Sequence, residues 1–432
     1  MDNETNMTEE NKTEEVTSEE ITSKEISPEE KKRMTRRFVS GLLIGVMCTA
    51  FVFMGIIIAS LYTPYAVVGG SSILDDATAQ KIKKLENLID TTYYKTDIDK
   101  EKERDGLYRG ILASLNDPYS VYYSKDDLLS FESETQGVYY GIGAYVAMDP
   151  DIQMPRISSV IPGTPAEESG LMPDDIICEV NKENIQGLTT EEVVAKIKGE
   201  ENTSVHLTLQ RDGEKERVEV DVLRKKIEIP TVNVKSLDNG IGYLQITEFD
   251  VVTLNQFIEG MAELKADDLR GLILDVRGNP GGNLDTVCDI VDQIVEKGKT
   301  IVYTVDRDGN RVDYVCKDPH KLDIPIVVLV NSYSASASEI LAGALKDYGK
   351  ATLVGTTTFG KGVVQSIYSL NDGTAVKLTV SSYFTPNGNN IHGIGIEPDV
   401  KVELDGEAFQ ADKTDTQLDK AVEVMNDLLD KE

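Results

Sequence analysis

The sequence predicts a multidomain α/β protein, and three observations support this fold class. The chain has 432 residues, more than one hydrophobic core of ordinary size accommodates, so about three folded units are expected. From about residue 229 onward, strand-like apolar runs alternate with helical patterns, as in a mainly parallel sheet covered by helices. The preceding part of the chain contains a helical region and a region of short β-rich runs.

The N-terminal segment is expected to be an appendage and not a folded domain. Residues 1–37 combine a Glu-, Thr- and Asn-rich acidic tail with a basic flank, a composition typical of disorder. Residues 38–61 are uncharged and long enough to span a bilayer as one helix, with a cleaved secretory signal as the alternative. The basic flank predicts a single-pass protein of the cytoplasmic membrane, with a cytoplasmic N-terminus and an extracytoplasmic catalytic part. Residues 62–74 would then form a linker.

Two small regions follow the linker. Residues 75–136 are predicted to form a helical subdomain, because apolar residues such as Leu107 and Ile111 recur at helical spacing. Residues 137–223 alternate short β-rich runs with turns, and their one clear helix opens at Thr189 in a capping box.

A glycine-containing loop opens the β-rich region. Its residues are Tyr140, Gly141, Ile142 and Gly143, and a predicted strand follows them. Glycines leave bare amides that could bind a carboxylate while an extended peptide adds to the adjacent sheet edge. A simple turn is the alternative interpretation of so short a motif.

Residues 224–432 are expected to form the α/β layer and to carry the chemistry. Ile326–Val330 is an apolar β-branched run that predicts a buried strand, and Glu339–Tyr348 has helical spacing. Four serines lie at this strand-to-helix turn: Ser332, Ser334, Ser336 and Ser338. The first amides of a helix lack internal partners and carry positive dipole, so an oxyanion forming there would be stabilised.

Lys361 admits three interpretations. Gly355–Lys361 matches a phosphate-binding loop, but Gly362 stands where that loop needs Ser or Thr, and a strand-like run follows in place of a helix. Alternatively Lys361 is a general base, since its apolar neighbours Phe359 and Val363 would lower its pKa by desolvation. By residue type alone, a surface lysine beside helix-capping serines is the third interpretation. The three histidines, at positions 206, 320 and 392, are harder to place as a base.

The composition argues against several other functions. A formal charge of −31 opposes nucleic-acid binding, because phosphates would be repelled. The four cysteines, at positions 48, 178, 288 and 316, form no CxxC pair and are interpreted as buried thiols in preference to a disulfide or redox pair. With so few histidines, a metal site is not expected, and the sequence implies no cofactor.

Two motifs that contain these serines and this lysine resemble the paired signatures of a known peptidase family. Asn331–Glu339 and Thr358–Gln365 are similar to those of the C-terminal processing proteases, also called tail-specific proteases. Ser159–Ala166 and Ser169–Ile177 resemble a PDZ domain. Further matching segments are Leu112–Ser120, Leu274–Gly282, Tyr383–Gly388 and Gly395–Asp399. The resemblance implies a serine peptidase whose core has crotonase/ClpP-like layers, with an inserted PDZ domain at residues 137–223.

The resemblance also implies roles for individual residues. It makes Ser336 the nucleophile. Residue chemistry alone could not choose Ser336 over Ser334 or Ser338. It makes Lys361 the base and Gln365 the residue that orients the lysine amine. The oxyanion hole would consist of the Ala337 amide and an amide of the Gly281-Gly282 turn, and the peptide-binding loop of the PDZ domain would be Tyr140, Gly141, Ile142 and Gly143. Glu339 and Asp347 also match family positions, where we favour structural hydrogen bonding.

Taken together, these features predict a membrane-anchored serine endopeptidase. Its PDZ domain would recognise exposed C-terminal tails of protein or peptide substrates, and a Ser-Lys dyad would hydrolyse them. The alternative is a catalytically inactive PDZ-based adaptor or scaffold. Homo-oligomerisation is left open by the sequence.

Overall fold

The computed structural model describes residues 72–319 and 321–431. The chain divides into two compact units between Ile98 and Asp99. In the described part of the first unit, α2 (Asp76–Thr92) begins after Asp75, whose carboxylate accepts a hydrogen bond from the Thr78 amide. The predicted acidic tail and the membrane segment at 38–61 lie outside the described residues. Among those described, none of the helices combines the length and the apolar character needed to cross a bilayer.

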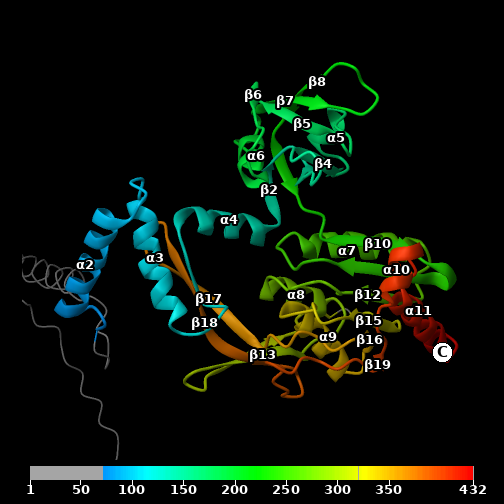
Figure 1. The fold of residues 1–432 in the computed structure, drawn as a ribbon. Helices are drawn as coiled ribbons and strands as arrows, with labels where there is room; N and C mark the ends of the chain where they lie inside the picture. Colours follow the sequence, from blue (N-terminus) through cyan, green and yellow to red (C-terminus); the bar gives the residue numbers. More distant parts are fainter. Residues whose placement is uncertain (1–71, 320, 432) are drawn as a thin grey trace, which may run out of the picture. The chain divides into compact units, whose positions relative to one another are not determined.

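The second unit begins with two helices and a short strand, labelled in Figure 1. These are α3 (Lys100–Ala113), β1 (Val121–Tyr123) and α4 (Lys125–Gln136). The helices agree with the predicted helical region. The strand was not predicted: β1 pairs antiparallel with β18 (Ala375–Phe384), so this region contributes to a sheet built mainly by the C-terminal half of the chain.

The β-rich region forms an antiparallel sheet with two helices, α5 (Pro165–Glu168) and α6 (Thr190–Ile197). Its strands are β2 (Val138–Gly141), β3 (Ala144–Met148), β4 (Pro155–Val160), β5 (Ile176–Val180), β6 (Glu183–Asn184), β7 (Ser204–Gln210), β8 (Val218–Leu223) and β9 (Lys225–Glu228). The order β3-β4-β5-β7-β8 makes β3 an edge strand, and β2 pairs separately with β9. The predicted capping box of α6, between Thr189 and Glu192, is present.

The C-terminal half contains the predicted parallel sheet, in the order β10-β11-β12-β15-β16-β19. Its strands are β10 (Val232–Ser236), β11 (Ile241–Ile246), β12 (Gly271–Asp275), β15 (Ile326–Val330), β16 (Ala351–Gly355) and β19 (Val400–Lys401). All neighbours are parallel except β10, which runs antiparallel to β11. The apolar runs recognised in the sequence therefore form the central strands.

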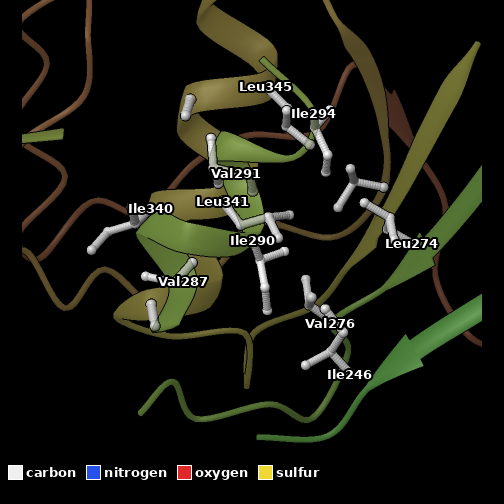
Figure 2. Packing of buried hydrophobic residues seen from close by; sticks show 14 of the residues in the cluster. Ile246, Leu274, Val276, Val287, Ile290, Val291, Ile294, Ile340, Leu341 and Leu345 are labelled. Atoms are coloured by element: carbon white, nitrogen blue, oxygen red, sulfur yellow. The ribbon is translucent and has the colours of Figure 1, made fainter. Parts of the chain in front are cut away.

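Helices cover both faces of this sheet. On one face lie α7 (Thr253–Ala266), α8 (Leu284–Asp292) and α9 (Ala337–Asp347), whose buried side chains share one core with Leu274. Figure 2 shows the part of this core that α8 and α9 form with Leu274. On the other face lies α11 (Thr416–Leu429), which packs against Ile273. Adjacent residues of β12 thus enter different cores, because successive side chains of a strand point to opposite faces. Two short helices, η1 (Asp238–Gly240) and α10 (Gly406–Asp412), complete this part.

An antiparallel sheet lies beside the parallel one. Its strands besides β1 and β18 are β13 (Thr300–Asp306), β14 (Arg311–Val315) and β17 (Val363–Ser369). Within the described residues, β17 pairs with β18 alone, so its outer edge is free. The strand expected after Lys361 is confirmed as β17, which excludes the helix that a phosphate-binding loop requires.

Candidate active site

Ser336 occupies a strained turn between β15 and α9. It is the N-cap of the helix, with φ 54° and ψ −111°. A positive φ is unusual for a residue other than glycine and costs free energy, so surrounding contacts must hold it. The turn has no Gly-x-Ser-x-Gly sequence, yet it places one serine, Ser336, at the N-terminus of a helix.

The four clustered serines have different environments. Ser334 and Ser338 are wholly buried, and their hydroxyls donate to the carbonyls of Val276 and Asn279 at 2.7 and 2.9 Å. Ser336 lines a cavity of about 520 Å³, together with Ala337, Gly282, Lys361 and Gln365. Ser332 is exposed and lies outside the lining of that cavity. The tertiary structure thus separates Ser336 from the others, which sequence chemistry could not do.

Lys361 is half-buried on the same cavity. Burial and the positive charge of Lys377 lower the pKa of Lys361, while Asp117 and Glu339 act in the opposite direction. Its Nζ lies 4.8 Å from the centroid of the Tyr119 ring. Within the described residues, no hydrogen bond joins the Lys361 amine to the Ser336 hydroxyl, although both residues line the same cavity.

Glu339 connects the backbones of these two residues. One oxygen, Oε2, accepts hydrogen bonds from the amides of Ser336 and Lys361, both at 2.9 Å. The other oxygen, Oε1, accepts from the Thr358 hydroxyl at 2.6 Å and from the Gly360 amide at 2.7 Å. The side chain is completely buried. The carboxylate therefore fixes the strained turn and the loop before β17 as one structure, in agreement with the structural role favoured for Glu339.

The same contacts argue against phosphate binding at Gly355–Lys361. Two of the loop amides, those of Gly360 and Lys361, already donate to the Glu339 carboxylate. A phosphate would need those amides free.

The glycine turn beside Ser336 follows β12. Gly281 has φ 113°, and a Cβ there would lie 2.8 Å from the Ser336 Cβ; Gly282 has φ 138°, and its Cβ would lie 2.4 Å from the Phe249 carbonyl oxygen. Only glycine fits this approach. The Gly281 amide donates to Asn279 Oδ1 at 2.8 Å. Among the described residues the amides of Gly282 and Ala337 have no acceptor. Of the amides predicted for the oxyanion hole, those of Gly281, Gly282 and Ala337, these two are therefore free to donate.

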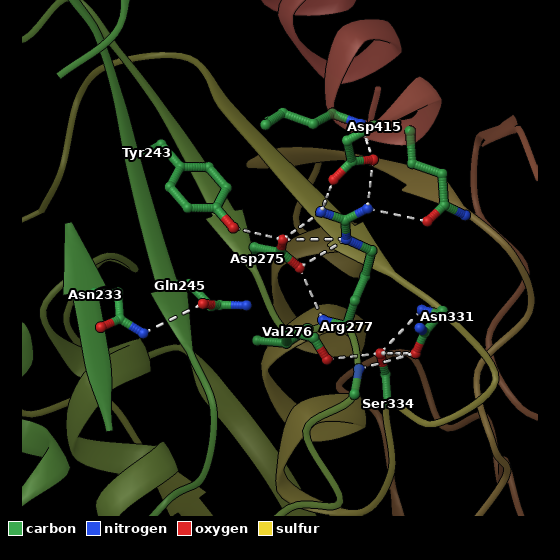
Figure 3. A network of polar contacts seen from close by, with 12 residues as sticks. Asn233, Tyr243, Gln245, Asp275, Val276, Arg277, Asn331, Ser334 and Asp415 are labelled. Atoms are coloured by element: carbon green, nitrogen blue, oxygen red, sulfur yellow. Dashed lines mark hydrogen bonds and ion pairs between the residues drawn. The ribbon is translucent and has the colours of Figure 1, made fainter. Parts of the chain in front are cut away.

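An ion-pair network holds the start of this turn. The Arg277 guanidinium donates to Asp275 at the end of β12 and to Asp415 at the N-terminus of α11, and the Tyr243 hydroxyl also donates to Asp275 (Figure 3). Asp275 is completely buried, and burial of a charge requires such partners. The C-terminal helix is thereby tied to the loop that leads to Gly281 and Gly282, the predicted oxyanion turn.

Gln365 lies on the cavity but makes a different contact from the predicted one. Its Nε2 donates to Thr379 Oγ1 at 3.2 Å, and among the described residues it forms no hydrogen bond with Lys361. The Thr379 amide in turn donates to Ser120 Oγ at 3.0 Å, and Ser120 Oγ donates to Asp117. Residues 117–120 thus support the lysine side of the site. Sequence reasoning missed this, although the Asn116–Ser120 stretch lies within one of the matching segments.

The predicted peptide-binding loop lies in the β-rich region. Tyr140 and Gly141 end β2, and Ile142 and Gly143 connect it to β3. The Ile142 side chain is buried in the core of the region, and a Cβ on Gly143 would overlap Thr164 at 2.3 Å. The free edge of β3 begins directly after this loop, beside α6.

Other predicted groups have structural partners. His206 hydrogen-bonds Asp221 and Glu219, and His392 Nδ1 accepts from the Gly362 amide at 3.4 Å. Position 320 lies outside the described residues. Asp347 accepts from the Asn387 amide at 2.8 Å, the structural role favoured for it.

The described cysteines are free thiols. Cys178, Cys288 and Cys316 are free, and burial raises the pKa of both Cys288 and Cys316 to about 12, which keeps them as thiols. Cys48 lies outside the described residues. Within residues 72–319 and 321–431 no group of three or more His, Cys, Asp or Glu side chains has the arrangement of a metal site.

Comparisons with known proteins match most of the chain. Residues 240–402 match the model of peptidase family S41, residues 156–211 that of a PDZ domain, and residues 60–127 that of the activating protease CtpB N-terminal domain. The chain is 38% identical to the carboxy-terminal processing protease CtpB of Bacillus subtilis, over 76% of this chain and 68% of that protein. It is also 38% identical to CtpA of Bacillus subtilis, over 83% of this chain and 78% of that protein. The solved structure of an S41 protease from Bacteroides fragilis has a similar fold, with a TM-score of 0.50. The two chains are 18% identical, and the match covers 80% of this chain and 97% of that one.

Proposed function

This chain belongs to the carboxy-terminal processing proteases, and on that premise we propose that Ser336 and Lys361 form the catalytic dyad of a membrane-anchored endopeptidase. It is a serine-type protease with a PDZ domain. The observation that carries the dyad is the position of Ser336: it is the clustered serine on the cavity, held in a strained conformation at a helix mouth beside the half-buried Lys361.

In this mechanism Ser336 Oγ attacks the carbonyl carbon of the scissile bond while Lys361, in its neutral form, takes the hydroxyl proton. Lys361 then donates that proton to the leaving amine, which leaves an acyl-enzyme. The amine then takes a proton from a water molecule whose oxygen attacks the ester carbon, and it returns that proton to Ser336 Oγ as the acid product leaves. The lowered pKa of Lys361 supports this role, because a larger share of the amine is neutral at a given pH.

The oxyanion of each tetrahedral intermediate would accept hydrogen bonds from the amides of Ala337 and Gly282. Both residues line the cavity, and both amides lack an acceptor within the described residues. The positive end of α9 adds to this stabilisation.

Proton transfer requires the Lys361 amine to reach Ser336, at about 2.6 to 3.2 Å. The amine lies instead over the Tyr119 ring. Because the Lys361 backbone is fixed by Glu339, rotation of its flexible side chain is the movement that would bring the amine to Ser336.

The substrate would bind as an extended chain. The free edge of β17 borders the cavity with Val363, Val364 and Gln365, and such an edge offers unpaired backbone groups to a peptide. We assign capture of the C-terminal tail to the Tyr140–Gly143 loop and the free edge of β3. The uncharged run at 38–61 supports a membrane anchor with the protease on the extracytoplasmic side.

Two substitutions test the dyad in the full chain. Ser336→Ala and Lys361→Ala are each expected to reduce cleavage of an unstructured C-terminal peptide by at least about a thousandfold, because nucleophile and base act as a unit. Ser332→Ala is the matched control, since that serine is exposed and outside the cavity. Circular dichroism checks the fold of each variant. Retained turnover in a folded Ser336→Ala or Lys361→Ala variant would reject the assignment.

A fluorophosphonate probe separates the protease from an inactive PDZ adaptor. Labelling of Ser336 in the unmodified protein, lost in Ser336→Ala, is expected of the protease. Tail binding without labelling or cleavage is what the adaptor predicts.

A further inference from the structure

Four carboxylates line the active-site cavity: Glu134, Glu248, Asp250 and Asp285. Glu134 on α4 and Glu248 and Asp250, between β11 and α7, all line the cavity that contains Ser336. Asp250 is buried, with 4% of its surface exposed, whereas Glu134 and Glu248 are exposed. These three residues are called the acidic wall below.

The described residues place no cationic side chain in an ion pair with the acidic wall. Within the described residues none of its three carboxylates takes part in a hydrogen bond or an ion pair. By contrast Asp275, which is completely buried, is paired with Arg277. Burial, followed by the charges of Glu248 and Glu134, raises the pKa of Asp250 to about 7. A buried carboxylate without a partner is costly, so a positive group at this wall would be bound favourably.

The acidic wall is attached directly to the oxyanion turn. The Phe249 amide donates to the Gly281 carbonyl at 2.9 Å, and the Asn283 amide donates to the Phe249 carbonyl at 2.6 Å. Glu248 and Asp250 flank this bridging residue, and in extended backbone such i and i+2 side chains lie on the same side. The Val251 amide donates to the Thr135 carbonyl, which brings the end of α4 and Glu134 to the same segment.

We propose that the acidic wall binds a lysine or arginine side chain of the substrate polypeptide, close to the scissile bond. This inference rests on the proposed peptidase function and adds a substrate class to it. Lys361 and Lys377 also line this cavity, and the Lys377 amine lies 5.3 Å from the centroid of the Phe131 ring on α4, the helix that carries Glu134. A basic substrate side chain is attracted to the carboxylates of the acidic wall, whereas an acidic side chain is repelled by them.

A peptide series tests the proposal on the full chain. One cleavable tail is made with lysine, its neutral isostere norleucine, or glutamate at each position near the scissile bond, and kcat/KM is measured for each. At one position the lysine peptide is expected to exceed the norleucine peptide by at least about tenfold, as for a hydrogen bond to a charged group. The glutamate peptide at that position is expected to be the poorest.

Charge removal at the wall supplies the decisive comparison. In the double variant Glu248→Gln, Asp250→Asn the ratio of the lysine to the norleucine peptide is expected to fall to about one. Glu132→Gln is the control, because Glu132 is exposed on the same helix as Glu134 but does not line the cavity. In this variant the ratio of the lysine to the norleucine peptide should equal that of the unmodified protein. An unchanged ratio in the double variant, or no lysine preference at any position, overturns the proposal.

Further outcomes separate a failure of the acidic-wall proposal from a failure of the proposed peptidase function. If the norleucine peptides are cleaved without any lysine preference, the peptidase function stands and only the role of the wall is rejected. If none of the peptides is cleaved, the proposed function fails and the preference with it. Suppression of the lysine preference by millimolar Ca²⁺ at constant ionic strength would assign the wall to a divalent cation and overturn the choice of occupant.

Discussion

The Glu339 carboxylate holds the backbone of Lys361: its Oε2 accepts a 2.9 Å hydrogen bond from the Lys361 amide and another from the Ser336 amide. The proposed nucleophile and the proposed base come from different segments, the start of α9 and the loop before β17. One buried side chain therefore sets the separation of their backbones. Glu339 acts through these residues and is a positioning residue.

Glu339→Gln is expected to lower kcat by at least about tenfold and to destabilise the fold by about 2 to 4 kcal/mol. The carboxylate accepts hydrogen bonds from backbone amides on both oxygens, whereas the NH₂ group of a glutamine would place a donor against those donors. The negative charge of Glu339 also raises the pKa of Lys361, so its removal is expected to move the acidic limb of the kcat/KM profile to lower pH. Chemical denaturation and pH–rate measurements check both effects.

Thr358→Val is the control for Glu339. It removes the Thr358 hydroxyl donor but leaves the carboxylate charge, so stability falls while the acidic limb stays in place. If the acidic limb of the kcat/KM profile of Glu339→Gln stayed at the pH of the unmodified protein, Glu339 would have no electrostatic influence on Lys361.

Activity is expected to rise with pH through the pKa of Lys361, because the neutral amine is the base. Lys377 lowers that pKa, and Asp117 and Glu339 raise it, while the Tyr119 ring lies against the ammonium group. Lys377→Gln removes the nearby positive charge, so the pKa of Lys361 should rise and the acidic limb should move to higher pH.

The shift in Lys377→Gln is opposite in direction to that of Glu339→Gln, which makes the pair diagnostic. Lys215→Gln, at an exposed position of the β-rich region, is the charge-matched control and should leave the limb unmoved. If Lys377→Gln moved the limb to lower pH, Lys361 would not be the group that titrates there.

The strained backbone at Ser336 predicts an unusual order of stabilities. Ser336→Gly is expected to be more stable than Ser336→Ala by about 1 to 2 kcal/mol, because glycine adopts a positive φ without the Cβ clash. Urea denaturation of both variants measures the difference, and neither should cleave peptide. An alanine variant as stable as the glycine variant would show that the turn is not strained.

The pairing of Asp415 with Arg277 is expected to contribute about 2 to 3 kcal/mol near pH 7. Burial alone would raise the pKa of Asp415, but hydrogen bonds from Arg277 and from the Leu418 amide lower it below 3.8 overall. Its contribution is therefore present above pH 3.8 and is lost as pH falls through the lowered pKa.

Asp415→Asn tests this contribution, because asparagine still caps α11 while it lacks the charge. The loss of stability should be full at pH 7 and should shrink below pH 3.8. Asp427→Asn, at an exposed position of the same helix, should show neither effect. A loss of equal size at pH 7 and pH 3 would mean that the ion pair contributes nothing.

The sequence by itself determined the four central strands of the parallel sheet, β11, β12, β15 and β16, and the strand-to-helix turn that carries the serines. These are local patterns, because periodicity and turn chemistry depend on residues near one another in the chain. The same local information left Ser334, Ser336 and Ser338 equivalent, since each is a serine close to a helix start.

Only the tertiary structure decided how those segments meet. Ser334 and Ser338 are excluded from the cavity because their hydroxyls donate to the carbonyls of Val276 and Asn279, more than fifty residues away in the chain. The bond from the Thr379 amide to Ser120 joins residues that are 259 positions apart. The acidic wall likewise combines α4 with the segment before α7. Such contacts depend on how β-strands pair across the whole chain, so the local pattern that forms each element does not specify them.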